Sequence, residues 1–114
     1  SVDMRSPKEQ EALILLGQLT QALNTLTLWQ SSTPSAKQMA SAAPFHCDTL
    51  TFEQWLQFVF IERISLMIKK KQPLPNKISL SPMAEESFKG LGNKADSLLG
   101  IIEQLDCLLS GRKA

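Results

Sequence analysis

Residues 45–75 constrain the fold most strongly, because the centre of this stretch is too apolar for a helix lying on a protein surface. Successive helical residues are about 100° apart around the axis, so the run Phe58–Ile61 places large apolar side chains on every side of one turn. Such a helix must be covered on all sides. We therefore predict that Phe52–Lys71 is the central helix of a bundle, with Phe58–Ile61 mostly buried.

Start and end signals flank this central helix. Thr51 is placed to accept hydrogen bonds from the first free N–H groups, and Gln54 can reach back to the Thr51 N–H, which together make a capping box. At the other end, Lys69–Lys71 complement the negative end of the helix dipole, and Pro73 prevents the helix from continuing. The helix therefore has defined ends.

A first helix is predicted at residues 6–29, where Ser6 provides a cap and Pro7 occupies the first helical position. Its apolar residues recur at spacings of four, three, four and three, which places one stripe along one face. The stripe consists of Ala12, Leu16, Leu19, Leu23 and Leu26. The opposite face is polar and uncharged, and the central helix carries more apolar surface than three neighbours cover. We therefore expect a weak homodimer.

Two further helices are predicted at residues 82–90 and 94–110. Ser81 and Asn93 are placed to cap them, and Gly111 closes the last one. Gly100 falls inside the last helix, where it costs about 1 kcal/mol relative to Ala, which suggests that another helix approaches closely there.

Together these patterns predict an all-α four-helix bundle with one short helix and a long loop between helices 1 and 2. Residues 31–44 form that loop, because Ser, Thr, Ala and two prolines break the helical period there. A short helical turn can start at Thr33–Pro34 and end before Ser41. A chain of 114 residues fits one domain, so we assign residues 1–114 to a single helical bundle.

The bulk composition predicts a soluble, cytoplasmic protein. The chain is 43% hydrophobic and 20% charged with a net charge of +1, so its overall charge does not indicate a nucleic-acid-binding protein. No apolar run reaches the roughly 18–20 residues of a membrane span, and no signal peptide is visible. Residues Ser1–Asp3 are interpreted as including a tag remnant, because the chain does not begin with Met.

Residues that carry catalytic or metal chemistry do not form a recognisable motif. Cys47 and Cys107 are far apart and follow no metal-ligand spacing, so we expect two reduced thiols rather than a disulfide. His46 is the only histidine and has no Cys, Asp or Glu at ligand spacing, so we expect no metal role for it. Ser79 and Ser81 have no identifiable base. No catalytic residue and no cofactor are predicted.

Three blocks, Pro44–Thr49, Gln54–Arg63 and Lys71–Pro75, together resemble the YqcC-like family of small helical proteins from gamma-proteobacteria, whose function is uncharacterised. The resemblance covers nearly the whole chain. The family is often named after a tRNA pseudouridine synthase of the C type, because the genes are commonly neighbours. The resemblance therefore implies a bundle that assists or accompanies tRNA modification, with such a synthase as a candidate partner.

That name does not imply the activity. Pseudouridine synthases need a catalytic aspartate in a G-R-x-D-type motif on a much larger mixed α/β domain. Here Gly111–Arg112 is followed by Lys113–Ala114, and no aspartate stands at the required position. The resemblance therefore predicts that the chain is not an enzyme.

Two classes of binding function remain. The first is a protein-binding accessory module, whose candidate contact residues surround the central helix and the linker after it: Phe45, Asp48, Trp55, Arg63, Lys71, Pro73, Leu74 and Pro75. The second is an RNA-binding adaptor, whose candidate phosphate contacts are Lys69, Lys70, Lys71 and Lys77. Salt separates the two classes, because phosphate binding weakens steeply with salt and apolar docking much less.

Asp48 and Thr49 can serve a structural role at the start of the central helix instead of binding a partner. Both precede the central helix, and either side chain can bond locally to the turn. A partner-binding role would instead leave Asp48 exposed beside Phe45 and Trp55. We favour the structural role.

Overall fold

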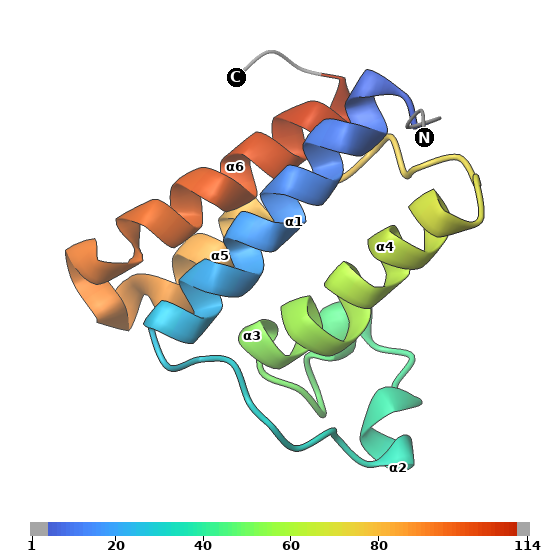
Figure 1. Ribbon diagram of the computed structural model, residues 1–114. Coiled ribbons are helices and arrows are strands. Elements are labelled where there is room, and N and C mark those ends of the chain that lie inside the picture. Colours follow the sequence, from blue (N-terminus) through green and yellow to red (C-terminus); the bar gives the residue numbers. More distant parts are fainter. Residues whose placement is uncertain (1–4, 112–114) are drawn as a thin grey trace.

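The computed structural model describes residues 5–111 and confirms the all-α fold, with no strand among those residues (Figure 1). The prediction about Ser1–Asp3 lies outside this range. The main helices are α1 (Pro7–Thr25), a central helix, α5 (Ser81–Phe88) and α6 (Asp96–Ser110). The central helix consists of α3 (Phe52–Trp55), a π-helical segment (Leu56–Phe60) and α4 (Ile61–Lys69), and a short α2 (Ala36–Met39) lies in the preceding loop.

In the bundle, α1 and α6 lie side by side, and the central helix flanks α1 on its other side (Figure 1). α5 contacts both α6 and α3. All four main helices contribute buried apolar side chains, with Ala84 and Phe88 coming from α5. The largest side chains that are almost fully buried come from α1, the central helix, α6 and the residue just before α5: Leu19, Leu23, Leu56, Ile64, Leu80, Leu98, Ile102, Leu105 and Leu109. One hydrophobic core therefore lies between the four helices.

The predicted Ser6 cap of α1 and the predicted capping box of α3 are confirmed, and Ser6 also forms a capping box with Glu9. The Ser6 hydroxyl accepts from the Glu9 N–H, and the Ser6 N–H donates to the Glu9 carboxylate at 2.8 Å. Thr51 and Gln54 make the same pair of bonds at the start of α3. Each box satisfies N–H groups that a helix start leaves free. The short α2 confirms the helical turn that the loop sequence predicts.

α1 ends at Thr25, four residues before the predicted end. The reason is a reversal at Thr27, whose φ of 59° is left-handed. After it, the Leu28 N–H donates to the Leu23 carbonyl at 2.8 Å, which closes the helix and turns the chain away from its axis. Leu28 and Trp29 consequently lie in the loop, where they pack half-buried against the core.

The expectation that the central helix is covered on all sides is wrong, although Phe58–Ile61 are buried or half-buried as predicted. Val59 and Phe60 are buried, whereas Phe58 and Ile61 are half-buried and the Leu66 side chain is 49% exposed. The bonding is also irregular, because the Ile61 N–H donates to the Leu56 carbonyl five residues back. Helical structure ends at Lys69, and Lys71 turns left-handed with a φ of 57°.

The start of α5 is capped by a residue that the sequence reasoning did not identify. Ser81 lies inside the helix and its hydroxyl makes no cap bond, so its predicted role is wrong. Instead the carboxylate of Asp106, on α6, accepts from the Leu80 N–H at 2.7 Å and from the Ser81 N–H at 2.8 Å. Asp106 is 1% exposed. A buried acidic side chain thus joins α6 to α5.

The start of α6 also differs from the prediction. Residues Lys89–Ala95 form two 3₁₀ turns that meet at a kink at Gly92, whose φ is 59°; α6 begins at Asp96, and Asn93 does not cap it. Gly100 does not mark a close helix approach, because a Cβ built there would meet no atom within 4 Å. Gly111 ends α6 as predicted, with a φ of 74°.

Candidate partner-binding site

A hollow of about 310 Å³ lies between the central helix and the segment that leads into α5. Phe45 from the preceding loop also reaches it. Five residues that the sequence analysis proposed for binding line this hollow together: Phe45, Trp55, Arg63, Pro75 and Lys77. We call it the aromatic hollow. Its size lies at the lower end of the roughly 300–1,000 Å³ range of ligand pockets.

Aromatic rings form one wall of the aromatic hollow. Phe45 meets Trp55 edge to face with ring centroids 4.9 Å apart, and Trp55 stacks on Phe60 at 5.6 Å. Rings at these separations attract one another beyond the area they bury. The hollow therefore has a packed apolar wall, in which Trp55 is only 8% exposed and Phe60 only 3%.

The loop that carries Phe45 is held in an unusual conformation. Phe45 and His46 have left-handed φ values of 56° and 52°, a conformation that costs non-glycine residues about 1–3 kcal/mol each. Bonds from the loop to α2 and its end support it: His46 Nε2 lies 3.0 Å from the Met39 carbonyl oxygen, and the Thr49 hydroxyl donates to the Gln38 carbonyl at 2.7 Å. The loop thereby fixes the position of the Phe45 ring.

Two cations stand at the rim of the aromatic hollow. Arg63 and Lys77 are both exposed. Neither forms an ion pair or hydrogen bond with any residue in the described range 5–111. No Asp or Glu lines the hollow. The lining of the aromatic hollow therefore combines an apolar wall with two positive charges.

The sequence analysis missed a cluster of glutamines between the loop after α1 and the central helix. Gln57 is 6% exposed, and its amide accepts from the Gln30 N–H at 3.0 Å and donates to the Gln30 carbonyl at 2.7 Å. Gln54 donates to the Gln30 side chain at 3.0 Å. A glutamine within an apolar helix was the available signal, because a buried amide needs partners. The cluster fastens the loop after α1 to the central helix.

The other proposed partner-binding residues do not line the aromatic hollow. Asp48 is exposed and accepts a hydrogen bond from the Ser41 hydroxyl across its own loop. Pro73 is exposed, and Leu74 packs half-buried against the core. Lys71 lies 3.9 Å from the Glu9 carboxylate, so it links the end of the central helix to the start of α1.

The proposed RNA-binding lysines divide between two places. Lys69, Lys70 and Lys71 are exposed at the end of α4. None of these three lines the aromatic hollow, whereas Lys77 does.

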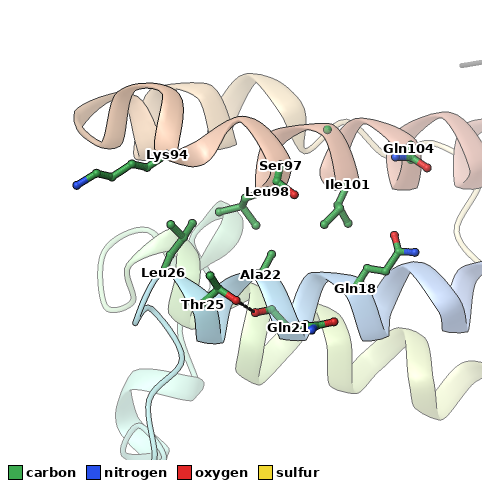
Figure 2. Close-up of a pocket in the computed structure, with 11 residues that line it drawn as sticks. Gln18, Gln21, Ala22, Thr25, Leu26, Lys94, Ser97, Leu98, Ile101 and Gln104 are labelled. Atoms are coloured by element: carbon green, nitrogen blue, oxygen red, sulfur yellow. Dashed lines mark hydrogen bonds between the residues drawn. The ribbon is translucent and has the colours of Figure 1, made fainter.

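A second and larger hollow of about 580 Å³ lies between α1 and α6, and the sequence analysis did not predict it. Ala22 of α1 and Leu98 and Ile101 of α6 point toward one another across this groove (Figure 2). Three glutamines also line it, and Gly100 contributes no side chain. The missing side chain at Gly100 therefore leaves open space in the groove.

Other chemical possibilities are limited in the part of the chain that the structure describes. No group of three or more His, Cys, Asp and Glu side chains there could hold a metal ion. Cys47 is exposed and Cys107 buried, and neither forms a disulfide. Among the same residues, no helix combines the length and apolar character needed to cross a bilayer.

Comparison with known proteins places the chain in a family. The model of the DUF446 family, described as tRNA pseudouridine synthase C, matches residues 11–108. The chain belongs to this family. A relative from Haemophilus influenzae, named only as an uncharacterised protein, is 38% identical over 98 residues, which cover 86% of this chain and 92% of the relative.

The solution NMR structure of YqcC from Escherichia coli has the same fold. Its TM-score is 0.82 at 27% identity, and the match covers 96% of this chain and 93% of YqcC. The resemblance to the YqcC-like family is thereby confirmed. A longer protein from Pectobacterium carotovorum, named tRNA pseudouridine synthase C, is 28% identical over 83 residues, which are 73% of this chain and 22% of that protein.

Proposed function

We propose that this chain is a non-catalytic protein-binding accessory module that acts with a tRNA pseudouridine synthase. The observation that carries the proposal is the aromatic hollow, where an apolar wall meets two exposed cations, Arg63 and Lys77, that have no partner among residues 5–111. Buried apolar anchors with a polar rim are the features through which protein partners bind. The hollow is the proposed contact site.

The length of the Pectobacterium relative supports the choice of partner. The segment similar to this chain makes up 22% of that protein, whose name is tRNA pseudouridine synthase C. In that protein the similar segment is joined to the rest of the synthase in one chain. Where the module is a chain of its own, the separate synthase is therefore a natural binding partner for it. The name of the relative therefore suggests that this chain associates with a tRNA pseudouridine synthase, and we assign the synthase activity to that partner and not to this chain.

The surroundings of the hollow support binding rather than catalysis. Ser79 lines the aromatic hollow, but no basic group bonds to its hydroxyl among the described residues. The His46 ring is engaged with the Met39 carbonyl. A serine without an adjacent base is a weak nucleophile.

The test uses purified full-length synthase from the bacterium that encodes this chain, and isothermal titration calorimetry measures its binding to the chain. Ser79→Trp places a large side chain on the exposed rim of the aromatic hollow, and Ser97→Trp places the same side chain at the α1–α6 groove as a matched control. We expect a complex that Ser79→Trp weakens and Ser97→Trp leaves unchanged.

Salt and nuclease treatment separate this proposal from the RNA-binding alternative. The complex should survive nuclease and depend modestly on salt, whereas contacts between phosphates and Lys69, Lys70, Lys71 and Lys77 would weaken steeply. Absence of binding, or binding that is lost with nuclease, would contradict the protein-binding proposal.

A further inference from the structure

We propose that the occupant of the aromatic hollow is an acidic peptide segment that inserts one bulky apolar side chain and pairs its carboxylates with Arg63 and Lys77. This inference rests on the proposed protein-binding function and specifies the chemistry of the partner at the same site.

The size and the lining of the aromatic hollow indicate the apolar side chain that the peptide inserts. Its wall consists of Phe45, Trp55 and Phe60, and Met67 and Ile78 contribute further apolar surface. A hollow of about 310 Å³ suits a single large side chain rather than a whole helix face. Burying such a side chain against this wall supplies affinity without charge.

The charged residues at the rim of the aromatic hollow indicate that the peptide is acidic. Arg63 and Lys77 are exposed cations without a partner among residues 5–111, and no acidic residue lines the hollow. Glu62 and Arg63 both line an adjacent depression, but they form no ion pair with each other. The lining of the aromatic hollow therefore carries two cations and no carboxylate, and a carboxylate next to the inserted side chain would pair with them.

The aromatic rings argue against a nucleic acid as occupant. Proteins that bind single-stranded nucleic acids present aromatic faces on which bases stack. Here the Trp55 and Phe60 rings stack on each other, and these residues are 8% and 3% exposed. They form a wall and do not offer an open stacking surface.

A peptide-display selection against the intact chain tests the inference without knowledge of the partner. We expect enrichment of peptides that carry a Leu, Phe or Trp with Asp or Glu within three residues. Binding of the enriched peptides, measured by fluorescence polarisation, should fall roughly 2- to 30-fold in the double variant Arg63→Gln/Lys77→Gln, as two exposed charge pairs predict. The control double variant Lys37→Gln/Lys94→Gln changes two exposed lysines outside the hollow and should bind as the unaltered chain does.

Three outcomes would overturn the inference: no enrichment above background, enrichment of peptides without acidic residues, or binding that both double variants reduce equally. These outcomes are distinguishable from failure of the proposed function. If the synthase binds and Ser79→Trp blocks it while the selection fails, only the acidic occupant is wrong. If acidic peptides bind and the synthase does not, the occupant stands and the proposed partner is wrong.

Discussion

Replacing Asp106 by Asn should destabilise the bundle substantially, although the two side chains are nearly equal in size. The Asp106 carboxylate is 1% exposed and accepts from the N–H groups of Leu80 and Ser81 at 2.7 and 2.8 Å. Both of its oxygens are therefore used. The amide of Asn has one acceptor oxygen, so its NH₂ group must face one of the two N–H donors.

The expected loss of stability follows from the two hydrogen bonds that the Asp106 carboxylate accepts. A hydrogen bond to a charged group contributes about 1.5–3 kcal/mol, and Asp106→Asn loses one such bond and the charge of the other. We expect a loss of roughly 1.5–3 kcal/mol in unfolding free energy. Asp106→Ala leaves both donors without a partner, at about 1–3 kcal/mol each, so its loss should be larger, at roughly 2–6 kcal/mol.

Urea denaturation followed by circular dichroism measures both variants, because the midpoint shifts in proportion to stability. Glu103→Gln is the matched control, since Glu103 is an exposed carboxylate on the same helix and should change stability by less than about 0.5 kcal/mol. If Asp106→Asn is as stable as this control, the carboxylate does not cap α5 and the account of the α5–α6 junction fails.

Three further predictions concern the core, the pH dependence and self-association. Leu56 is 0% exposed, so Leu56→Ala should cost about 2–5 kcal/mol in a denaturation experiment; a loss below 1 kcal/mol would contradict its core position. The Ser6 N–H bond, with the charge of Lys71, outweighs the opposing effect of burial and lowers the pKa of Glu9 from its ordinary value of 4.5. The stability that the Glu9 carboxylate contributes is therefore present above pH 4.5 and lost as the pH falls through its folded-state pKa, so Glu9→Gln should make the free energy of unfolding depend less on acid pH. If the variant and the unaltered chain lose stability equally on acidification, this role of Glu9 is refuted. The exposed Leu66 should support a weak homodimer that Leu66→Glu weakens in sedimentation, and a purely monomeric chain at high concentration would end that prediction.

The sequence predicted the helices well where the signals are local. The capping boxes at Ser6 and Thr51 involve residues three positions apart, so a reader of the sequence can find them. The cap of α5 could not be found in this way, because Asp106 is 25 residues from Ser81 in the chain. Ser81 resembles a cap in the sequence, but the tertiary contact with Asp106 takes its place.

Some of the residues that the sequence proposed for binding lie together in the structure, and their role in binding stays a prediction. Phe45, Trp55, Arg63, Pro75 and Lys77 meet at one hollow, and this arrangement follows from a loop and a linker that fold back on the central helix. The local sequence pattern could not distinguish these five residues from Asp48, Pro73 and Leu74, which do not line the aromatic hollow. The α1–α6 groove was not anticipated because Gly100 was interpreted as a point of close approach, whereas its neighbours leave space.

The central claim is that a protein partner contacts the aromatic hollow, and the two tryptophans of the chain test it most directly. Trp55 lines the hollow and Trp29 does not. We would label both indole groups, add purified synthase and record their NMR signals. We expect the Trp55 signal to shift or broaden while the Trp29 signal stays unchanged. A complex that leaves Trp55 unchanged, or no response from either tryptophan, would contradict it.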